Sequence, residues 1–542
     1  MSKPKAAKDP AKGKRSKGSD DARSAKDRSG KAHSARENSS QDRTAKAHGR
    51  KGRSGPKSSQ PLVQDSVIQG EPGSPAGQRL YDMPYSAVAP RLISPERGLH
   101  NLVTRAGHNA GYTIDVTLLD APDHRLIRSG LLLAHRVLDG RGEWYLGSSA
   151  WRPILPEELI EPMGQADLPE SFVELIRPFR RRATVGPVAA LTCERREFAL
   201  RDDSGHTLAL LRDDKVTVRR GGLTTARFRE VMLTPTATGL SEEQSAHVTY
   251  ALASAGATQV PAFPPLCSRL CAPATGPTDF PVPQRLYPDS SFAHFVSHLL
   301  ATRLRQVLEA DLRVRTDVPG AEAELGAHVA QLRSELQGLS SVVDVAWMED
   351  LDEELEWVVE QAQLASRRAT GRVEEPATGT LKQRLRGERY LTLLDRLVTA
   401  TRAPQVGNAS TIRAAEVLAS LVNEAQSDVQ RSAAALQVDS PAEQWTAAGV
   451  SFDSLFRITE VARHLLPKRV ERLRHRLGVA SQLLGEAAKH DRAAQHSRDR
   501  AASSSAEEAF ALGRAYEHEL DVARSAREAF VRRWAKTAKK LE

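Results

Sequence analysis

The chain has 542 residues, which is enough for two or three domains that each bury a core of their own. Its three cysteines, Cys193, Cys267 and Cys271, are too few for a disulfide framework, and no second Cys or His pair follows them at zinc-finger spacing. No apolar run reaches the roughly 18 residues that would span a bilayer. We therefore expect a cytoplasmic protein with reduced cysteines and no membrane span.

Residues 1–60 are basic and almost free of large apolar side chains. They hold 18 Lys and Arg against 6 Asp and Glu, whereas the remainder of the chain holds 59 against 62. Such a segment cannot offset the entropy of ordering itself, so we predict a disordered arm. It is either a solubilising tail or a loose electrostatic contact for polyphosphate or nucleic acid. Nucleic-acid contact would be non-specific, because no aromatic side chains are interleaved for stacking. Residues 61–100 remain rich in Pro and Gly and are interpreted as a linker.

Residues 101–257 contain short apolar runs bounded by turn residues. Examples are "YTIDVTLLD" and "FREVMLT", and Asp-Gly and Ser-Gly pairs punctuate the region. This alternation predicts antiparallel strands, interrupted by one helix around "LPESFVELIRPFRRR". We expect an α+β domain with a meandering sheet or barrel. Residues 258–288 are predicted to be a Pro-rich connector, in which "CSRLC" is a loop and not a metal site.

Residues 289–542 are predicted to be helical throughout. Apolar residues recur at spacings of three and four, as in "FAHFVSHLLATRLRQVLEADLRVR" and "FDSLFRITEVARHLL". Breaks rich in Pro, Gly and Asn separate about eight to ten such segments, which is typical of a helical bundle. The expected fold class is therefore α+β followed by all-α.

This succession resembles proteins that fuse a CYTH domain to a CHAD domain. The stretches "LRSELQGLSSVVDVAWMEDLDEELEWVVEQAQLASR", "RYLTLLDRLV" and "LGVASQLLGE" follow the CHAD pattern in order, and "LLDAPDHRLIRSGLLLAHR", "EWYLG" and "FREVMLT" resemble successive CYTH strands. The resemblance implies an antiparallel eight-stranded tunnel that binds triphosphate through acidic residues, a divalent metal and inward Arg and Lys. It also implies a helical domain whose basic surface holds polyphosphate.

The CYTH-like region departs from the family at its functional positions. No Glu-x-Glu-x-Lys triplet precedes Gly111, and Ala134 and His135 stand where the family has arginines, so that only Arg136 remains. Glu230 is left as a weak remnant of the metal site, and a lone carboxylate is a poor metal ligand set. We therefore expect a tunnel fold with no catalytic residues and no cofactor. A metal-dependent triphosphatase that has moved its ligands stays as the enzymatic alternative, and a divalent metal would be needed only in that case.

The CHAD-like region has also lost most of the family's basic positions. Ala323 stands at the family histidine, and Gly326 and Ala330 follow where the family has arginines, which leaves this face without charge. His328 lies at the edge of the buried stripe and is interpreted as a partly buried packing residue. Nine polyanion-binding candidates remain, namely Arg125, Arg128, Arg136, Arg333, Arg463, Lys468, Arg469, Arg472 and Arg476.

These expectations combine into a non-enzymatic binding or scaffold protein for polyphosphate or another polyanion, with degenerate CYTH and CHAD sites. The basic arm would supply much of the affinity, and the protein would associate with polyphosphate granules in the cytoplasm. The third alternative is non-specific nucleic-acid binding through the arm alone. The oligomeric state stays open.

Overall fold

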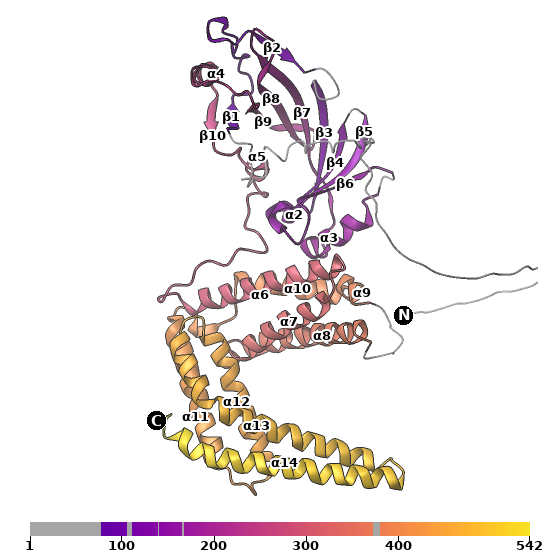
Figure 1. Ribbon diagram of the computed structural model, residues 1–542, viewed down its shortest axis with the longest axis vertical. Coiled ribbons are helices and arrows are strands. Elements are labelled where there is room, and N and C mark those ends of the chain that lie inside the picture. Colours follow the sequence, from indigo (N-terminus) through magenta and orange to yellow (C-terminus); the bar gives the residue numbers. More distant parts are fainter. Residues whose placement is uncertain (1–76, 106–110, 139, 165–166, 372–379, 542) are drawn as a thin grey trace, which may run out of the picture. The chain divides into compact units, whose positions relative to one another are not determined.

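A computed structural model describes residues 77–105, 111–138, 140–164, 167–371 and 380–541. The predicted arm and the first part of the predicted linker lie outside these residues. Within them the chain forms an antiparallel sheet in its N-terminal half, followed by helices (Figure 1). The predicted fold class, α+β followed by all-α, is confirmed.

The sheet has ten strands in the order β10-β1-β9-β8-β7-β3-β4-β5-β6, with β2 paired to β7, and every pairing is antiparallel. The strands are β1 (Arg79–Met83), β2 (Asn101–Thr104), β3 (Gly111–Asp120), β4 (Leu132–Leu138), β5 (Arg141–Gly147), β6 (Glu158–Pro162), β7 (Gly186–Arg201), β8 (Thr207–Arg220), β9 (Leu223–Pro235) and β10 (Thr258–Val260).

Two strands lie outside the bounds predicted for the sheet domain. Strand β1 falls in the predicted linker and pairs with β9, and β10 falls in the predicted connector and pairs with β1. They have five and three residues, which is too short to show an alternating pattern in the sequence. Their conformation is set by pairing with strands distant in the chain.

The sheet buries both of its faces. One face packs against α5 (Leu266–Leu270), where Leu266 and Leu270 meet Val216 and Phe228. We call it the α5 face. The opposite α4 face packs Val231 and neighbouring side chains under α4 (Glu242–Ser254) at one end. Its other end lies among α2 (Arg125–Arg128), α3 (Glu170–Arg180) and the helices that follow. Helix α3 confirms the helix predicted inside the sheet region.

Nine α-helices follow within residues 292–371 and 380–541, in agreement with the predicted eight to ten. They are α6 (Phe292–Arg315), α7 (Ala321–Gln337), α8 (Val345–Ala369), α9 (Leu381–Arg386), α10 (Glu388–Arg402), α11 (Ala414–Ala434), α12 (Ala442–Ala462), α13 (Pro467–Ala501) and α14 (Ala506–Ala538). Among the described helices, none is long and apolar enough to cross a bilayer.

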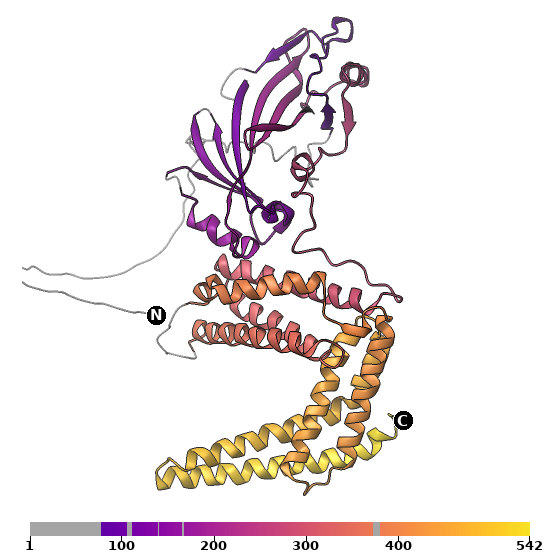
Figure 2. The same ribbon diagram turned by 180° about the vertical axis from the view of Figure 1, so that it is seen from behind.

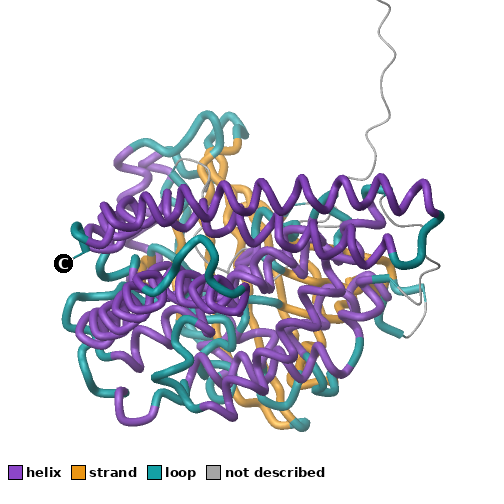
Figure 3. The backbone as a smooth tube through the Cα atoms, turned by 90° about the horizontal axis from the view of Figure 1, so that it is seen from below, coloured by secondary structure: helices purple, strands orange, loops and turns teal. Residues whose placement is uncertain are grey.

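Side-chain caps explain where several of these helices begin. Ser291, Asp344 and Ser505 each accept a hydrogen bond from a backbone N–H in the first turn of α6, α8 and α14 respectively. Helices α13 and α14 then run side by side as an antiparallel pair (Figures 2 and 3). This pair places the two ends of the segment 467–541 close to each other.

Candidate functional site

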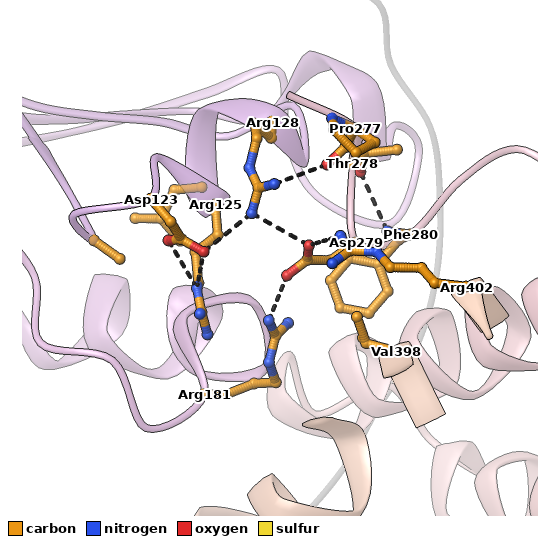
Figure 4. Close-up of polar contacts among 12 residues, drawn as sticks. Asp123, Arg125, Arg128, Arg181, Pro277, Thr278, Asp279, Phe280, Val398 and Arg402 are labelled. Atoms are coloured by element: carbon orange, nitrogen blue, oxygen red, sulfur yellow. Dashed lines mark hydrogen bonds and ion pairs between the residues drawn. The ribbon is translucent and has the colours of Figure 1, made fainter. Parts of the chain in front are cut away.

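Two of the predicted cations, Arg125 and Arg128, are held in an ion network. The Nε of Arg125 lies 3.0 Å from an oxygen of Asp123, and Arg128 lies 3.1 Å from the same carboxylate. Arg128 also reaches Asp279 at 3.3 Å and donates to the carbonyl of Pro277 (Figure 4). Since carboxylates already neutralise both guanidinium groups, neither is available as a separate anion contact.

Charged side chains on the α5 face neutralise one another. In the strand register Asp82, Glu230, Asp214 and Arg195 stand opposite one another across β1, β9, β8 and β7. Arg195 donates two hydrogen bonds of 2.8 Å to Asp214. Burial lowers the pKa of Arg195, but the charge and hydrogen bonds of Asp214 outweigh burial and raise it overall. Arg269 of α5 lies 3.1 Å from Asp82 and 3.6 Å from Glu230.

The predicted metal remnant, Glu230, therefore faces a guanidinium. In the described part of the chain, no group of three or more His, Cys, Asp or Glu is arranged to hold a metal ion. Asp82 was missed by the sequence reasoning because its strand was interpreted as linker. A short apolar-polar run, "RLYDM", is the signal that could have indicated it.

Arg136, the third sheet candidate, is buried on the same face. It is 2% exposed, forms an ion pair with Glu143, and stacks with its Cζ 4.5 Å from the ring centroid of Tyr145. Around these ion pairs the face is packed with apolar side chains, including Leu266 and Leu270 of α5. The arginines that would line a triphosphate tunnel are thus each paired with a carboxylate on the same face, Arg136 with Glu143 and Arg195 with Asp214.

Arg333 of α7 is also engaged by carboxylates. Its guanidinium donates to both oxygens of Asp352 at 2.8 Å and to Glu356 at 2.9 Å, and both carboxylates belong to α8. Its hydrogen bond to Asp352 raises the pKa of Arg333, and the same bond lowers the pKa of Asp352. The guanidinium joins α7 to α8.

Of the neighbouring positions on α7, His328 lies as predicted and Gly326 does not. His328 is partly buried, as predicted, with 26% of its side chain exposed and its Nε2 3.7 Å from Glu324. Gly326, in contrast, does not belong to a bare outer face. It is buried, and a Cβ placed there would lie 3.2 Å from the Cβ of Ala362 in α8, so the missing side chain permits close helix packing.

Four candidates on α13 differ from the rest. Lys468, Arg469, Arg472 and Arg476 lie within about 100° of one another around the helix, given its advance of about 100° per residue. The apolar stripe that includes Leu477 lies on another side and is buried. Among the described residues none of the four has a carboxylate partner. Arg469 donates to the Asn423 side chain, and Arg476 donates at 2.6 Å to the carbonyl of Lys540.

Arg463 precedes these four and is not like them, because it lies 3.1 Å from Glu460. Glu460 also receives Arg474, whose side chain is 37% exposed. A hollow of about 520 Å³ opens beside this corner and is lined by Arg463, Val470 and Arg474, among others.

A second run of cations lies at the C-terminal end of α14 and in the turn that follows it, beside the first. Four exposed residues form it, with Trp534 and Thr537 buried on another side: Arg533 and Lys536 belong to α14, and Lys539 and Lys540 follow it. Sequence reasoning missed them, although "RRWAKTAKK" shows the spacing of three and four. Together with the four on α13 they form what we call the basic surface. Residues 468–476 and 527–540 hold 11 Lys and Arg against 2 Glu.

Comparisons with known proteins find likeness in solved structures. Neither a family model nor a curated protein matches the sequence. PptA from Streptomyces chartreusis is 19% identical over 45% of this chain and 100% of its own, with a TM-score of 0.35. The CHAD domain from the plant Ricinus communis is 16% identical over 46% of this chain and 95% of its own, with a TM-score of 0.32.

A Bacillus halodurans protein described as a candidate adenylate cyclase is 13% identical over 30% of this chain and 90% of its own, with a TM-score of 0.18. The structural neighbours thus include a CHAD domain, the family that the sequence motifs indicated for the helical part.

Proposed function

We propose that the chain is a non-enzymatic polyanion-binding protein and that the basic surface of α13 and α14 is its binding site. The observation that carries this proposal is the contrast between two groups of cations. Five of the nine sequence candidates are paired with carboxylates: Arg125, Arg128, Arg136, Arg333 and Arg463. The other four, with the four at the C-terminal end of α14 and just after it, are concentrated on one helix pair and keep their charge available.

The ligand class follows from how such a surface gains affinity. Exposed cations on one face neutralise a polyanion and release its counterions. Each contact is weak by itself, but it forms more readily once a neighbouring contact already holds the ligand. Polyphosphate is the simplest ligand with charges spaced along one chain. The eight residues are all Lys or Arg, and Trp534 beside them is buried, so this surface offers charge more than a platform for stacking. Nucleic acid would therefore be held chiefly through its phosphates.

The α5 face supports the non-enzymatic part of the proposal. Phosphoryl transfer needs fixed cations and a metal that can act on the phosphate. On this face Arg195 and Arg136 are instead held by Asp214 and Glu143, and α5 with its apolar side chains covers the surrounding strands.

Polyphosphate binding by the full chain, titrated at several salt concentrations, tests the site. In a variant with Lys468, Arg472, Lys536 and Lys539 changed to Gln, we expect affinity to fall by more than about tenfold at low salt, because four of eight contacts are lost. The slope of log affinity against log salt should become shallower by about three. Affinity is measured by a filter-retention or fluorescence titration.

The matched control changes four exposed arginines that lie elsewhere and are each already paired with a carboxylate. This control variant has the same net charge as the variant of the basic surface. A similar loss of affinity in the control would therefore contradict a localised site. Those arginines are Arg97, Arg152, Arg413 and Arg431. A chain without residues 1–60 separates the contribution of the arm. Phosphate release with Mg²⁺ or Mn²⁺ that Glu230→Gln abolishes would overturn the non-enzymatic assignment.

A further inference from the structure

A small pocket of about 140 Å³ lies on the α4 face of the sheet, on the side away from Arg195 and Asp214. Its floor consists of three rows of side chains set by strand register. Glu194, Lys215 and Arg229 stand opposite one another across β7, β8 and β9. The floor therefore begins with a charged row, and the segment 87–92 lies over it.

The next two rows change the character of the floor. Arg196 stands opposite Asp213, and then Phe198 stands opposite Leu211. Leu102 of β2 adds to the apolar end of the pocket. Successive rows on one face of a strand are about 7 Å apart. The pocket thus has a charged end and an apolar end within the length of one small molecule.

Arg229 binds both the segment that covers the pocket and the carboxylate of Asp213. It is 3% exposed, and its Nε and Nη2 donate to the two oxygens of Asp213, each at 2.7 Å. Its Nη1 donates at 2.7 Å to the carbonyl of Ala87, which anchors the overlying segment. Both oxygens of Asp213 are therefore committed to Arg229, although Arg196 is its neighbour across the strands.

Arg196 and Lys215 consequently have cationic groups that the described residues do not pair with a carboxylate. Lys215 lies with its Nζ 5.8 Å from the ring centroid of Tyr85. The one other carboxylate in the lining, Glu194, is exposed, and the lining holds three cations and two carboxylates. One positive charge stays uncompensated at the charged end.

We propose that this pocket binds a small organic anion with an apolar body about the size of one ring and a single carboxylate or phosphate head. The head would lie between Arg196 and Lys215, and the body against Phe198, Leu211 and Leu102. A cavity of about 150 Å³ is large enough to hold a benzene-sized molecule. The site is separate from the basic surface and does not depend on the polyanion proposal.

Benzoate and phenyl phosphate are the probes, and ligand-observed NMR titration of the full chain is the measurement. We expect at least one of them to bind with a dissociation constant of the order of 1 mM, as suits a ligand of so few atoms. Arg196→Gln and Lys215→Gln should each weaken binding by about tenfold. Arg219→Gln, an exposed arginine on the same strand outside the pocket, should leave it unchanged.

Three results would overturn the proposal. If both probes have dissociation constants above about 20 mM, the proposed site does not exist, since millimolar affinity is already weak. Benzyl alcohol binding as tightly as benzoate would show that the cations play no part. Inorganic phosphate binding as tightly as phenyl phosphate would show that the apolar end plays none. Circular dichroism of each variant verifies that it is folded.

Discussion

At the scale of single residues, Asp120 shows how burial and hydrogen bonding compete. Its carboxyl is 1% exposed and accepts from the backbone N–H groups of Ala121, Leu126 and Ile127 at 2.6, 2.9 and 2.9 Å. Burial raises the pKa, the three hydrogen bonds lower it, and burial prevails, so that the pKa is raised to about 6. This carboxyl holds the turn that leads into α2 and its arginines.

The raised pKa of Asp120 predicts a pH dependence with a definite sign. Between about pH 4 and pH 6 the folded chain binds this proton more tightly than the unfolded chain does. The contribution of Asp120 to the free energy of unfolding is therefore complete below about pH 4 and is lost as the pH rises through about 6. A ¹³C NMR titration of the carboxyl should have its midpoint near pH 6. Asp202, which also accepts a backbone hydrogen bond but is less buried than Asp120, should titrate below its ordinary value.

Residue identity was visible in the sequence, but residue partners were not. The sequence located every candidate arginine, yet it could not show that Arg128 meets Asp279, which lies 151 positions further along the chain. The same is true of Arg333, whose partners lie on the next helix. Lys468 and its three neighbours on α13 were predicted as candidates, and the folded chain adds only the observation that no described carboxylate reaches them.

At the scale of elements, long helices were predictable because many residues share one periodicity. Helices such as α6, with 24 residues, repeat their apolar spacing over several turns. Strands β1 and β10 contain too few residues for any period, and the contact of Gly326 with α8 depends on a neighbouring helix. The local sequence pattern thus revealed where the helices lie, but not which of their faces pack against other helices.

Two helix-associated glycines give opposite predictions for substitution by alanine. A Cβ on Gly338, at the end of α7, would lie 3.0 Å from the backbone carbonyl atoms of Arg457 in α12. Because backbone cannot move aside easily, Gly338→Ala should destabilise the chain by about 1–3 kcal/mol. Gly485 in α13 is exposed with nothing near its Cβ position, so Gly485→Ala should stabilise by about 0.5–1 kcal/mol. Urea unfolding measures both, and equal effects of the two substitutions would contradict the packing argument.

At the scale of the whole molecule, the connector takes part in the core. Phe280 forms edge contacts with Trp151 and Phe179 of the sheet region, and one apolar cluster continues from these residues into α6 and α10. Beside Phe280, Asp279 is 2% exposed and receives Arg128, Arg181 and Arg402 (Figure 4). Sequence pattern predicted this region only as a Pro-rich connector, because its contacts are all distant along the chain.

Asp279 is therefore predicted to be important for stability far beyond an ordinary ion pair. Asp279→Ala would leave three guanidinium groups together without the buried charge that they share, and should lower the free energy of unfolding by about 3–5 kcal/mol. Denaturant unfolding followed by circular dichroism measures the loss. Asp428→Ala provides the control, since its pair with Arg431 is exposed and should be worth less than about 1 kcal/mol. A similarly small effect of Asp279→Ala would show that the network contributes little.

The hydrogen bond from Arg476 to the carbonyl of Lys540 joins the two cationic runs, which are 64 positions apart in the chain. The charges on α13 are therefore held next to those at the C-terminal end of α14. A single orthophosphate can touch only a few of them at once, while an extended ligand can lie across both helices. Such a surface would discriminate by length: what it recognises is how far a row of negative charges extends, more than which chemical group carries them.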